Sequence, residues 1–152
     1  MLLDGVNHVA VLTDDLDRFH EFWTGVFGAE VEGHAHAGED VELSFVRIGP
    51  HTELNVFCKR GQTVPGRDAM FRRGPIDHLG VQAASLEAFE EIRRRLMARG
   101  AADDFVTDFG PVLSVFFRDP DGLECEVCVA NPDAVPGVTN PPGTRAARYP
   151  AA

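Results

Sequence analysis

The sequence predicts an α+β fold built from two β-α-β-β-β modules in tandem. A histidine opens two similar apolar segments seventy residues apart, His8 before Val9-Ala10-Val11 and His78 before Leu79-Gly80-Val81. An amphipathic segment recurs at the same offset, at Leu16, Phe19 and Phe22 and again at Leu86, Phe89 and Ile92. Self-similarity at a fixed period indicates a duplicated structural unit. Each half of the chain is therefore expected to contain the same elements in the same order.

The first module is expected over about residues 5–58. Residues 7–12 are typical of a buried strand, and Thr13-Asp14-Asp15 supplies capping side chains for a helix that runs to Phe27 and stops at Gly28. Three strands are expected after the helix, at 31–36, 41–48 and 53–58, because turn residues separate these apolar segments.

The second module is expected over about residues 75–130. It begins with a strand at 78–82 and a helix that Ser85 caps and Gly100 closes. Strands at 105–107, 113–117 and 123–129 follow, and Asp119-Pro120-Asp121-Gly122 predicts a turn between the last two. A basic linker, residues 59–74, joins the modules, and the proline-rich residues 131–152 are expected to form an extended tail.

Bulk properties are those of one compact domain over residues 1–152. A chain of 152 residues with 44% hydrophobic content can fill a core. Its 24 acidic and 14 basic residues give a net charge of −10, which disfavours binding to nucleic acid or to anionic membranes. Neither a membrane span nor a secretory signal is evident, so a cytoplasmic protein is expected. Three cysteines without framework spacing are expected to be reduced: Cys58, Cys125 and Cys128.

The repeat also places candidate metal ligands. Each copy begins with a histidine, and its last strand carries a polar residue at an offset of seventy-one, Asn55 in the first copy and Glu126 in the second. A carboxylate among apolar residues is costly to bury unless it is paired or metal-bound. His8, His78 and Glu126 form a two-histidine, one-carboxylate set, which suits Fe(II), Mn(II) and related divalent ions, including Ni(II) and Zn(II), and leaves positions open for substrate.

Further side chains are candidates for substrate contacts. His34 and His36 alternate onto one face of a strand, where they either line a pocket or lie exposed at the strand end. Phenylalanines on the face that carries the ligands, Phe45 and Phe116 among them, would give the site an apolar wall.

Three segments, residues 7–11, 77–81 and 119–126, resemble the vicinal oxygen chelate superfamily, which includes glyoxalase I, extradiol dioxygenases and bleomycin-resistance proteins. The resemblance covers about residues 5 to 130. It implies paired modules that form a cupped mixed sheet around a divalent metal ion, which holds two adjacent oxygen atoms of a small substrate. It also implies a homodimer.

Carried over residue by residue, the resemblance puts the metal ligands on His8, His78 and Glu126. The fourth family position falls on Asn55, where glyoxalase I has a glutamate that acts as a base, and an amide is a poor base. Glu53 lies on the same strand face as Asn55, so a register shift of two residues would make Glu53 and Glu124 the inner pair. Extradiol dioxygenases have a tyrosine ten residues before the glutamate, and that position is Phe116 here.

The resemblance therefore implies a metal-dependent enzyme that is either dioxygenase-like or glyoxalase-like, the latter a lyase or isomerase. The alternative is a metal-free binding protein of the bleomycin-resistance type that sequesters a small molecule. The acidity of the chain would favour cationic ligands in that case.

Overall fold

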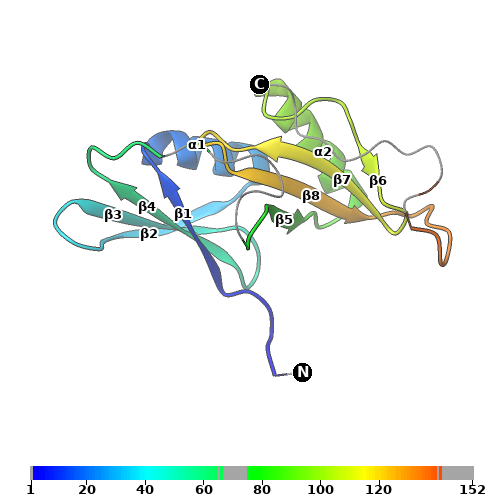
Figure 1. Ribbon diagram of the computed structural model, residues 1–152, viewed down its shortest axis with the longest axis horizontal. Coiled ribbons are helices and arrows are strands. Elements are labelled where there is room, and N and C mark those ends of the chain that lie inside the picture. The colour runs from blue at the N-terminus through cyan, green and yellow to red at the C-terminus, as the bar shows by residue number, and fades with distance from the viewer. Residues whose placement is uncertain (1, 65, 67–74, 140, 142–152) are drawn as a thin grey trace. The chain divides into compact units, whose positions relative to one another are not determined.

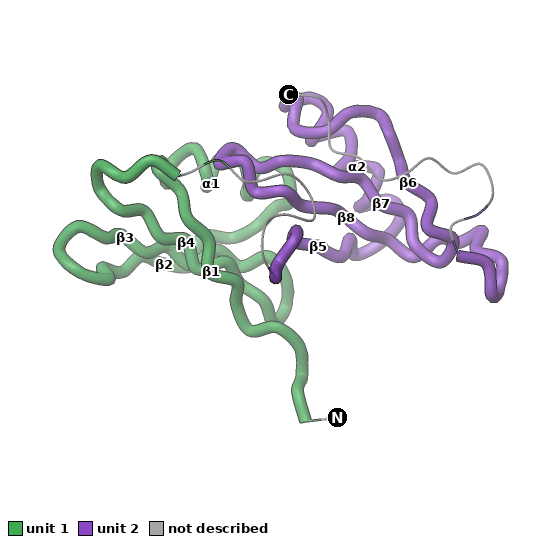
Figure 2. The backbone as a smooth tube through the Cα atoms, viewed as in Figure 1, with its two compact units in different colours: residues 1–66 green, residues 67–152 purple. Residues whose placement is uncertain are grey.

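The computed structural model describes residues 2–64, 66, 75–139 and 141, and it divides into two compact units, residues 1–66 and 67–152 (Figure 2). Each unit contains one helix and one four-stranded mixed sheet in the order β-α-β-β-β (Figure 1). The predicted α+β class and the duplicated module are confirmed.

The first unit is built from β1 (His8–Thr13), α1 (Leu16–Phe27), β2 (Glu30–His36), β3 (Val41–Arg47) and β4 (Glu53–Lys59). The strands lie in the order β1-β4-β3-β2, with β1 parallel to β4 and the other neighbours antiparallel. The helix begins where the carboxylate of Asp15 accepts a hydrogen bond from the backbone N–H of Arg18 at 3.0 Å. It ends at Gly28, as predicted.

The second unit is built from β5 (Leu79–Gln82), α2 (Leu86–Ala98), β6 (Thr107–Asp108), β7 (Val112–Arg118) and β8 (Glu124–Ala130). The strand order β5-β8-β7-β6 repeats that of the first unit, and β5 is parallel to β8. The strand expected at 105–107 is shorter and begins two residues later. Its ladder with β7 stops after Asp108 because Gly110 and Pro111 turn the chain at once.

One face of each sheet is covered by the helix of the same unit. In the first unit the largest fully buried side chains are Phe19, Trp23 and Val26 of the helix and Val46, Leu54 and Val56 of the sheet. In the second unit they are Phe89 and Leu96 of the helix and Val115, Phe117, Cys125 and Val127 of the sheet. Strand side chains alternate between faces, so the opposite face of each sheet carries Asn55 in one unit and Glu126 in the other. No helix in the described part of the chain has the length and apolar character needed to cross a membrane.

The beginning of the predicted tail is attached to the second unit. Asn131 donates its backbone N–H to the carbonyl of Pro111 at 2.9 Å and its side-chain amide to the carbonyl of Gly110 at 2.8 Å. Residues 131–139 therefore pack on the turn between β6 and β7. The rest of the tail, apart from Pro141, and residues 65 and 67–74 of the predicted linker lie outside the described residues.

Candidate functional site

Two of the three predicted metal ligands face each other in the second unit. His78 directly precedes β5, and Glu126 lies on β8, where Gly80 is its parallel partner. The Nε2 atom of His78 lies 3.1 Å from Oε1 of Glu126. The other ring nitrogen, Nδ1, lies 2.9 Å from a carboxylate oxygen of Asp77, which holds the ring in place. Nε2 of His78 and Oε1 of Glu126 thus lie together on one sheet face, and both are atoms that can ligate a metal ion.

The carboxylate of Glu126 lies over a glycine of the neighbouring strand. A Cβ atom added at Gly80 would lie 3.4 Å from Oε1 of Glu126, so the carboxylate occupies the space above the glycine. The corresponding residue of the first unit, seventy positions earlier, is Ala10. The two units therefore differ by one methyl group at this position.

Ser114 and Cys128 complete the surroundings of the carboxylate. The hydroxyl of Ser114 donates a hydrogen bond of 2.6 Å to Oε2 of Glu126. Burial, together with the charge of Glu126 and a hydrogen bond to it, raises the pKa of the Cys128 thiol to about 11. Cys128 therefore stays protonated near neutral pH, which rules it out as a ready thiolate nucleophile.

The environment also shifts the pKa of His78. Burial alone would lower this pKa, but hydrogen bonds and charge interactions with Asp77 and Glu126 outweigh burial and raise it above its ordinary value. The raised pKa favours the protonated imidazolium form of His78. Because a histidine binds metal as a neutral imidazole, a bound cation would have to displace the added proton.

The neighbouring carboxylate of Glu124 has a different partner. Its side chain is almost fully buried and pairs with the guanidinium group of Arg118, at 2.9 Å to Nη2 and 3.1 Å to Nε. In the second unit, the acid that faces the histidine is therefore Glu126, and the shifted register with Glu124 inward does not describe this module.

The first unit repeats the arrangement without the carboxylate. His8 begins β1, and its Nδ1 lies 2.8 Å from the side-chain oxygen of Asn7, the counterpart of Asp77. In the β1–β4 pair, Glu53 is the partner of His8 and Asn55 is the partner of Ala10. The side-chain oxygen of Asn55 is buried, with no hydrogen-bond partner among the described residues. A buried polar atom without a partner is uncommon in folded proteins.

The two predicted phenylalanines occupy equivalent places. Phe45 is the cross-strand partner of Asn55, and Phe116 is the partner of Glu126. The ring of Phe116 lies against His78, with 5.8 Å between centroids, and against Phe109, with 6.4 Å. An apolar wall thus lies beside the His78–Glu126 pair in the second unit.

His34 and His36 lie elsewhere. Their cross-strand partners are Ser44 and Glu42, whereas Phe45 is the residue that pairs with Asn55, so alternation puts these histidines on the face that carries α1. The register therefore places them on the sheet face opposite to Phe45. Their role in binding a substrate stays a prediction.

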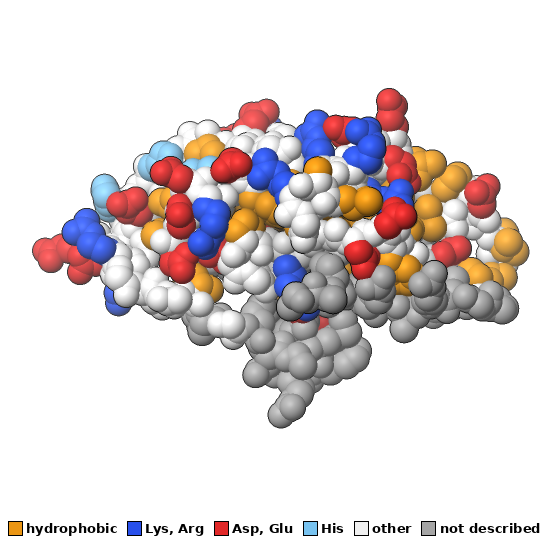
Figure 3. Space-filling view, turned by 90° about the horizontal axis from the view of Figure 1, so that it is seen from above, with side chains coloured by type: hydrophobic (Ala, Val, Ile, Leu, Met, Phe, Trp, Pro, Cys, Tyr) orange, Lys and Arg blue, Asp and Glu red, His pale blue; other side chains and the backbone are white. Residues whose placement is uncertain are grey.

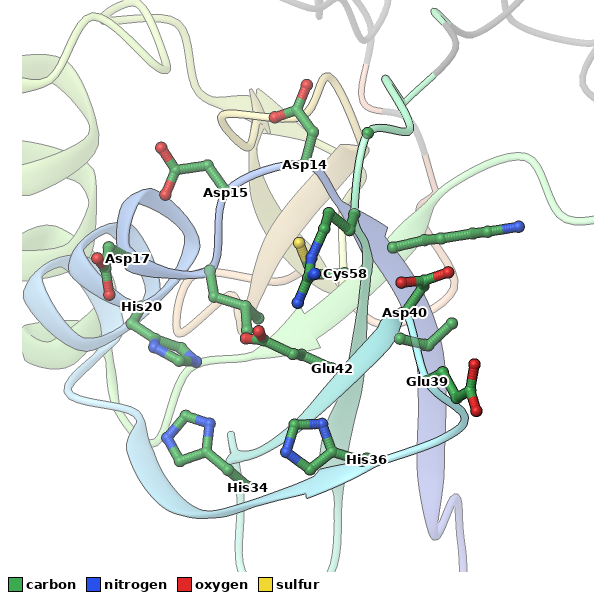
Figure 4. Close-up of a pocket in the computed structure, with 15 residues that line it drawn as sticks. Asp14, Asp15, Asp17, His20, His34, His36, Glu39, Asp40, Glu42 and Cys58 are labelled. Carbon is green, nitrogen blue, oxygen red and sulfur yellow. The ribbon is translucent and has the colours of Figure 1, made fainter.

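These histidines line a pocket of about 490 Å³ in the first unit (Figure 4). His20 of α1 points into it, 5.5 Å from His34 between ring centroids, and its Nε2 lies 2.8 Å from the hydroxyl of Ser44. Burial, and then the neighbouring His34, lower the pKa of His20. Sequence reasoning missed the contacts of His20 with His34 and Ser44. They depend on the β2–β3 register, which no local sequence pattern indicates.

Sequence reasoning also missed Ser114, Asn7 and Asp77. The residues before the two histidines could have been found from the repeat, since each supplies a side-chain oxygen at the same offset. Ser114 needed the β7–β8 register, in which it lies diagonal to Glu126.

The predicted trio is divided between the units, with His8 in residues 1–66 and His78 and Glu126 in residues 67–152. Within the described residues, no three histidine, cysteine, aspartate or glutamate side chains gather closely enough to hold a metal ion. Acidic and basic side chains are interspersed on the face that Figure 3 shows, and many arginines pair with carboxylates, among them Arg18, Arg47, Arg93, Arg95 and Arg118.

Comparison with solved structures gives the same fold. The chain is similar to a glyoxylase/bleomycin resistance protein/dioxygenase domain from Frankia sp. EAN1pec, with a TM-score of 0.74, 21% identity and coverage of 86% of this chain and 95% of that chain. It is similar to the trypanothione-dependent glyoxalase I of Leishmania major, with a TM-score of 0.63, 24% identity and coverage of 80% of this chain and 83% of that chain.

A third similar structure is the fosfomycin resistance protein FosX from Listeria monocytogenes, complexed with Mn(II) and sulfate. Its TM-score is 0.62, with 18% identity and coverage of 87% of this chain and 97% of that chain. The comparison with curated proteins found no match.

The family model described as "Glyoxalase/Bleomycin resistance protein/Dioxygenase superfamily" matches residues 5–127, which include both histidines and Glu126. This span holds both modules and ends within β8. The chain therefore belongs to the glyoxalase/bleomycin resistance protein/dioxygenase superfamily, the vicinal oxygen chelate group that its repeated histidine motifs resemble.

Proposed function

We propose that the chain is a metal-dependent enzyme in which His8, His78 and Glu126 hold one divalent ion and a small oxygenated substrate. The observation that carries the proposal is the 3.1 Å separation of His78 Nε2 and Glu126 Oε1. Two ligand atoms that bind one metal at about 2.1 Å and at a right angle lie about 3 Å apart. The spacing supports a shared ion.

The donor set suits such an ion. Two imidazoles and one carboxylate fit Fe(II), Mn(II), Ni(II) or Zn(II), and both imidazoles already have Nδ1 engaged by the preceding residue, which leaves Nε2 for the metal. Bound there, the ion would supply Lewis-acid polarisation of adjacent substrate oxygens. The presence of Mn(II) in the FosX structure supports Mn(II) as the first ion to try.

Other side chains of the chain would contact the substrate and exclude water. Phe116 and Phe45 would exclude water and contact an apolar part of the substrate, because each lies beside the polar residue of its sheet face. Asn55 would accept or donate a hydrogen bond with its buried amide and would not take up a proton.

Proton transfer, where the reaction needs it, would fall to Glu53 or Glu126. Glu53 is half-buried and lines a hollow of about 240 Å³ together with Arg47 and His51. A glyoxalase-like lyase or isomerase reaction requires such a base, whereas a dioxygenase-like reaction would have to proceed with phenylalanine at position 116.

Metal analysis of the purified protein tests the proposal. One equivalent of metal is expected in the wild type and in His34→Ala, a control that removes a histidine from the opposite sheet face, and much less in His78→Ala and Glu126→Ala. If no metal binds after Fe(II), Mn(II), Ni(II) and Zn(II) have each been supplied, the proposal of a metal-dependent enzyme is refuted. The alternative of a metal-free binding protein then remains.

A substrate screen then separates the reaction classes. Turnover of catechols with oxygen would indicate a dioxygenase, and turnover of 2-oxoaldehydes with thiols would indicate a glyoxalase-like reaction. Tight binding of cationic antibiotics without turnover would favour sequestration. We also propose that the chain forms a homodimer, which light scattering on the purified protein would test.

A further inference from the structure

The two oxygen atoms of the Glu126 carboxylate have different partners. Oε1 faces Nε2 of His78 at 3.1 Å, and Oε2 accepts a hydrogen bond of 2.6 Å from the hydroxyl of Ser114. We propose that Ser114 is a positioning residue that occupies Oε2 and so reserves Oε1 for the metal ion. This inference rests on the proposed function, because it assigns a role to Ser114 in the same site.

The contact has the character of an orienting bond. A hydroxyl has one proton to donate, and a distance of 2.6 Å is that of a charge-assisted hydrogen bond to a carboxylate. Ser114 is fully buried on β7, so its position is set by the sheet. A carboxylate that is hydrogen-bonded at one oxygen cannot rotate freely. Oε2, which Ser114 engages, is less available to the metal than Oε1.

The first unit shows that this serine accompanies the acid. Phe116 pairs with Glu126 and Ser114 pairs with Cys128, whereas in the first unit Phe45 pairs with Asn55 and Leu43 pairs with Phe57. The place of Ser114 is therefore taken by Leu43 in the module that has an amide instead of a carboxylate. There the side-chain oxygen of Asn55 is buried with no hydrogen-bond partner among the described residues.

Both histidines of the predicted ligand trio also have a side chain that orients them. Asp77 holds Nδ1 of His78, and Asn7 holds Nδ1 of His8, so each imidazole ring is fixed by a second side chain. With Ser114 included, each member of the predicted ligand trio has at least one neighbour that orients it. Loss of such a neighbour typically lowers metal affinity or activity about 10- to 100-fold.

The sharpest test compares Ser114→Thr with Ser114→Val, because the two introduced side chains have the same shape and differ in the hydroxyl group. The affinity of each variant for Mn(II) is measured by calorimetry, and the ratio of the two affinities isolates the hydroxyl from any effect of size. Ser114→Val is expected to bind Mn(II) about 10- to 100-fold more weakly than Ser114→Thr. Ser114→Ala should weaken binding to a similar extent.

A matched control comes from the first unit. Ser44 is as fully buried as Ser114 and also bonds a titratable side chain, His20, but on the opposite sheet face. Ser44→Ala should therefore destabilise the protein without changing the affinity for Mn(II). The visible absorption of the Co(II)-loaded protein gives a second readout, because it reports the number and arrangement of ligands. This spectrum should change in Ser114→Val and not in Ser44→Ala.

The outcomes separate the two proposals. Equal Mn(II) affinity and equal Co(II) spectra in Ser114→Thr and Ser114→Val, in a protein whose Mn(II) binding requires Glu126, would overturn the role of Ser114 alone. Equal weakening in Ser44→Ala and Ser114→Ala would also overturn it, because the loss would then follow general destabilisation. Mn(II) binding that is absent from the wild type, or unchanged in Glu126→Ala, would overturn the metal site itself.

Discussion

Replacing Gly110 by alanine is expected to loosen the turn between β6 and β7 and the tail packed on it. Gly110 has φ of +91°, a conformation that costs an L-residue about 1–2 kcal/mol. A Cβ atom there would also meet the carbonyl oxygen of Val138 far inside contact distance and the Cα of Thr139 at 3.1 Å. The backbone of residues 138–139 would have to move, because no flexible side chain can yield.

The size of the effect follows from these two costs. Moving the tail puts at risk the hydrogen bond from the Asn131 amide to the Gly110 carbonyl, which contributes about 0.5–1.5 kcal/mol. The sum is a loss of about 1.5–3.5 kcal/mol in the free energy of unfolding. For a domain of this size, such a loss lowers Tm by about 3–14 °C.

Gly122→Ala is the matched control for this prediction. Gly122 has φ of +80°, yet a Cβ atom there would meet nothing within 4 Å, so this variant carries the backbone strain without the clash. Urea unfolding of both variants should show Gly110→Ala less stable than Gly122→Ala by about 1 kcal/mol. Equal losses would refute the packing of residues 131–139 on the turn.

Two further predictions concern charged groups. Arg118→Met should destabilise the protein by about 1–3 kcal/mol, because it leaves the buried carboxylate of Glu124 without its hydrogen-bond partner. Arg47→Met, at the equivalent place in the first unit, should cost less than about 1 kcal/mol because its ion pairs are exposed. Equal losses of the two variants in urea unfolding would contradict this. Because the folded pKa of His20 lies below its ordinary value of 6.5, protonation favours the unfolded state, so the wild type should lose more stability than His20→Gln as the pH falls from above 6.5 through the folded pKa. Parallel pH profiles of unfolding for these two proteins would show that His20 makes no such contribution.

Much of the fold could be predicted from the sequence because its signals are local or periodic. Asp15 and Ser85 cap the two helices as expected. His8 begins β1, and His78 directly precedes the equivalent strand β5. The predicted position of β6 is wrong because the end of this strand depends on the turn at Gly110 and on its pairing with β7.

The candidate site could be predicted in part for the same reason. His78 and Glu126 meet as the repeat indicated, while Ser114 was not recognised, because a serine in a buried strand carries no signal until the register places it beside an acid. His34 and His36 share a face as alternation requires, but alternation alone does not say which face the helix covers.

The sequence by itself determined the duplicated module, the histidine that begins each copy, and the difference between Asn55 and Glu126 at their ends. Only the tertiary structure decided which acid faces His78, since Glu124 and Glu126 lie on one strand face and differ in their partners, Arg118 and His78. The physical reason is that spacing along a chain sets which side chains share a face. Pairing across strands sets which of them touch.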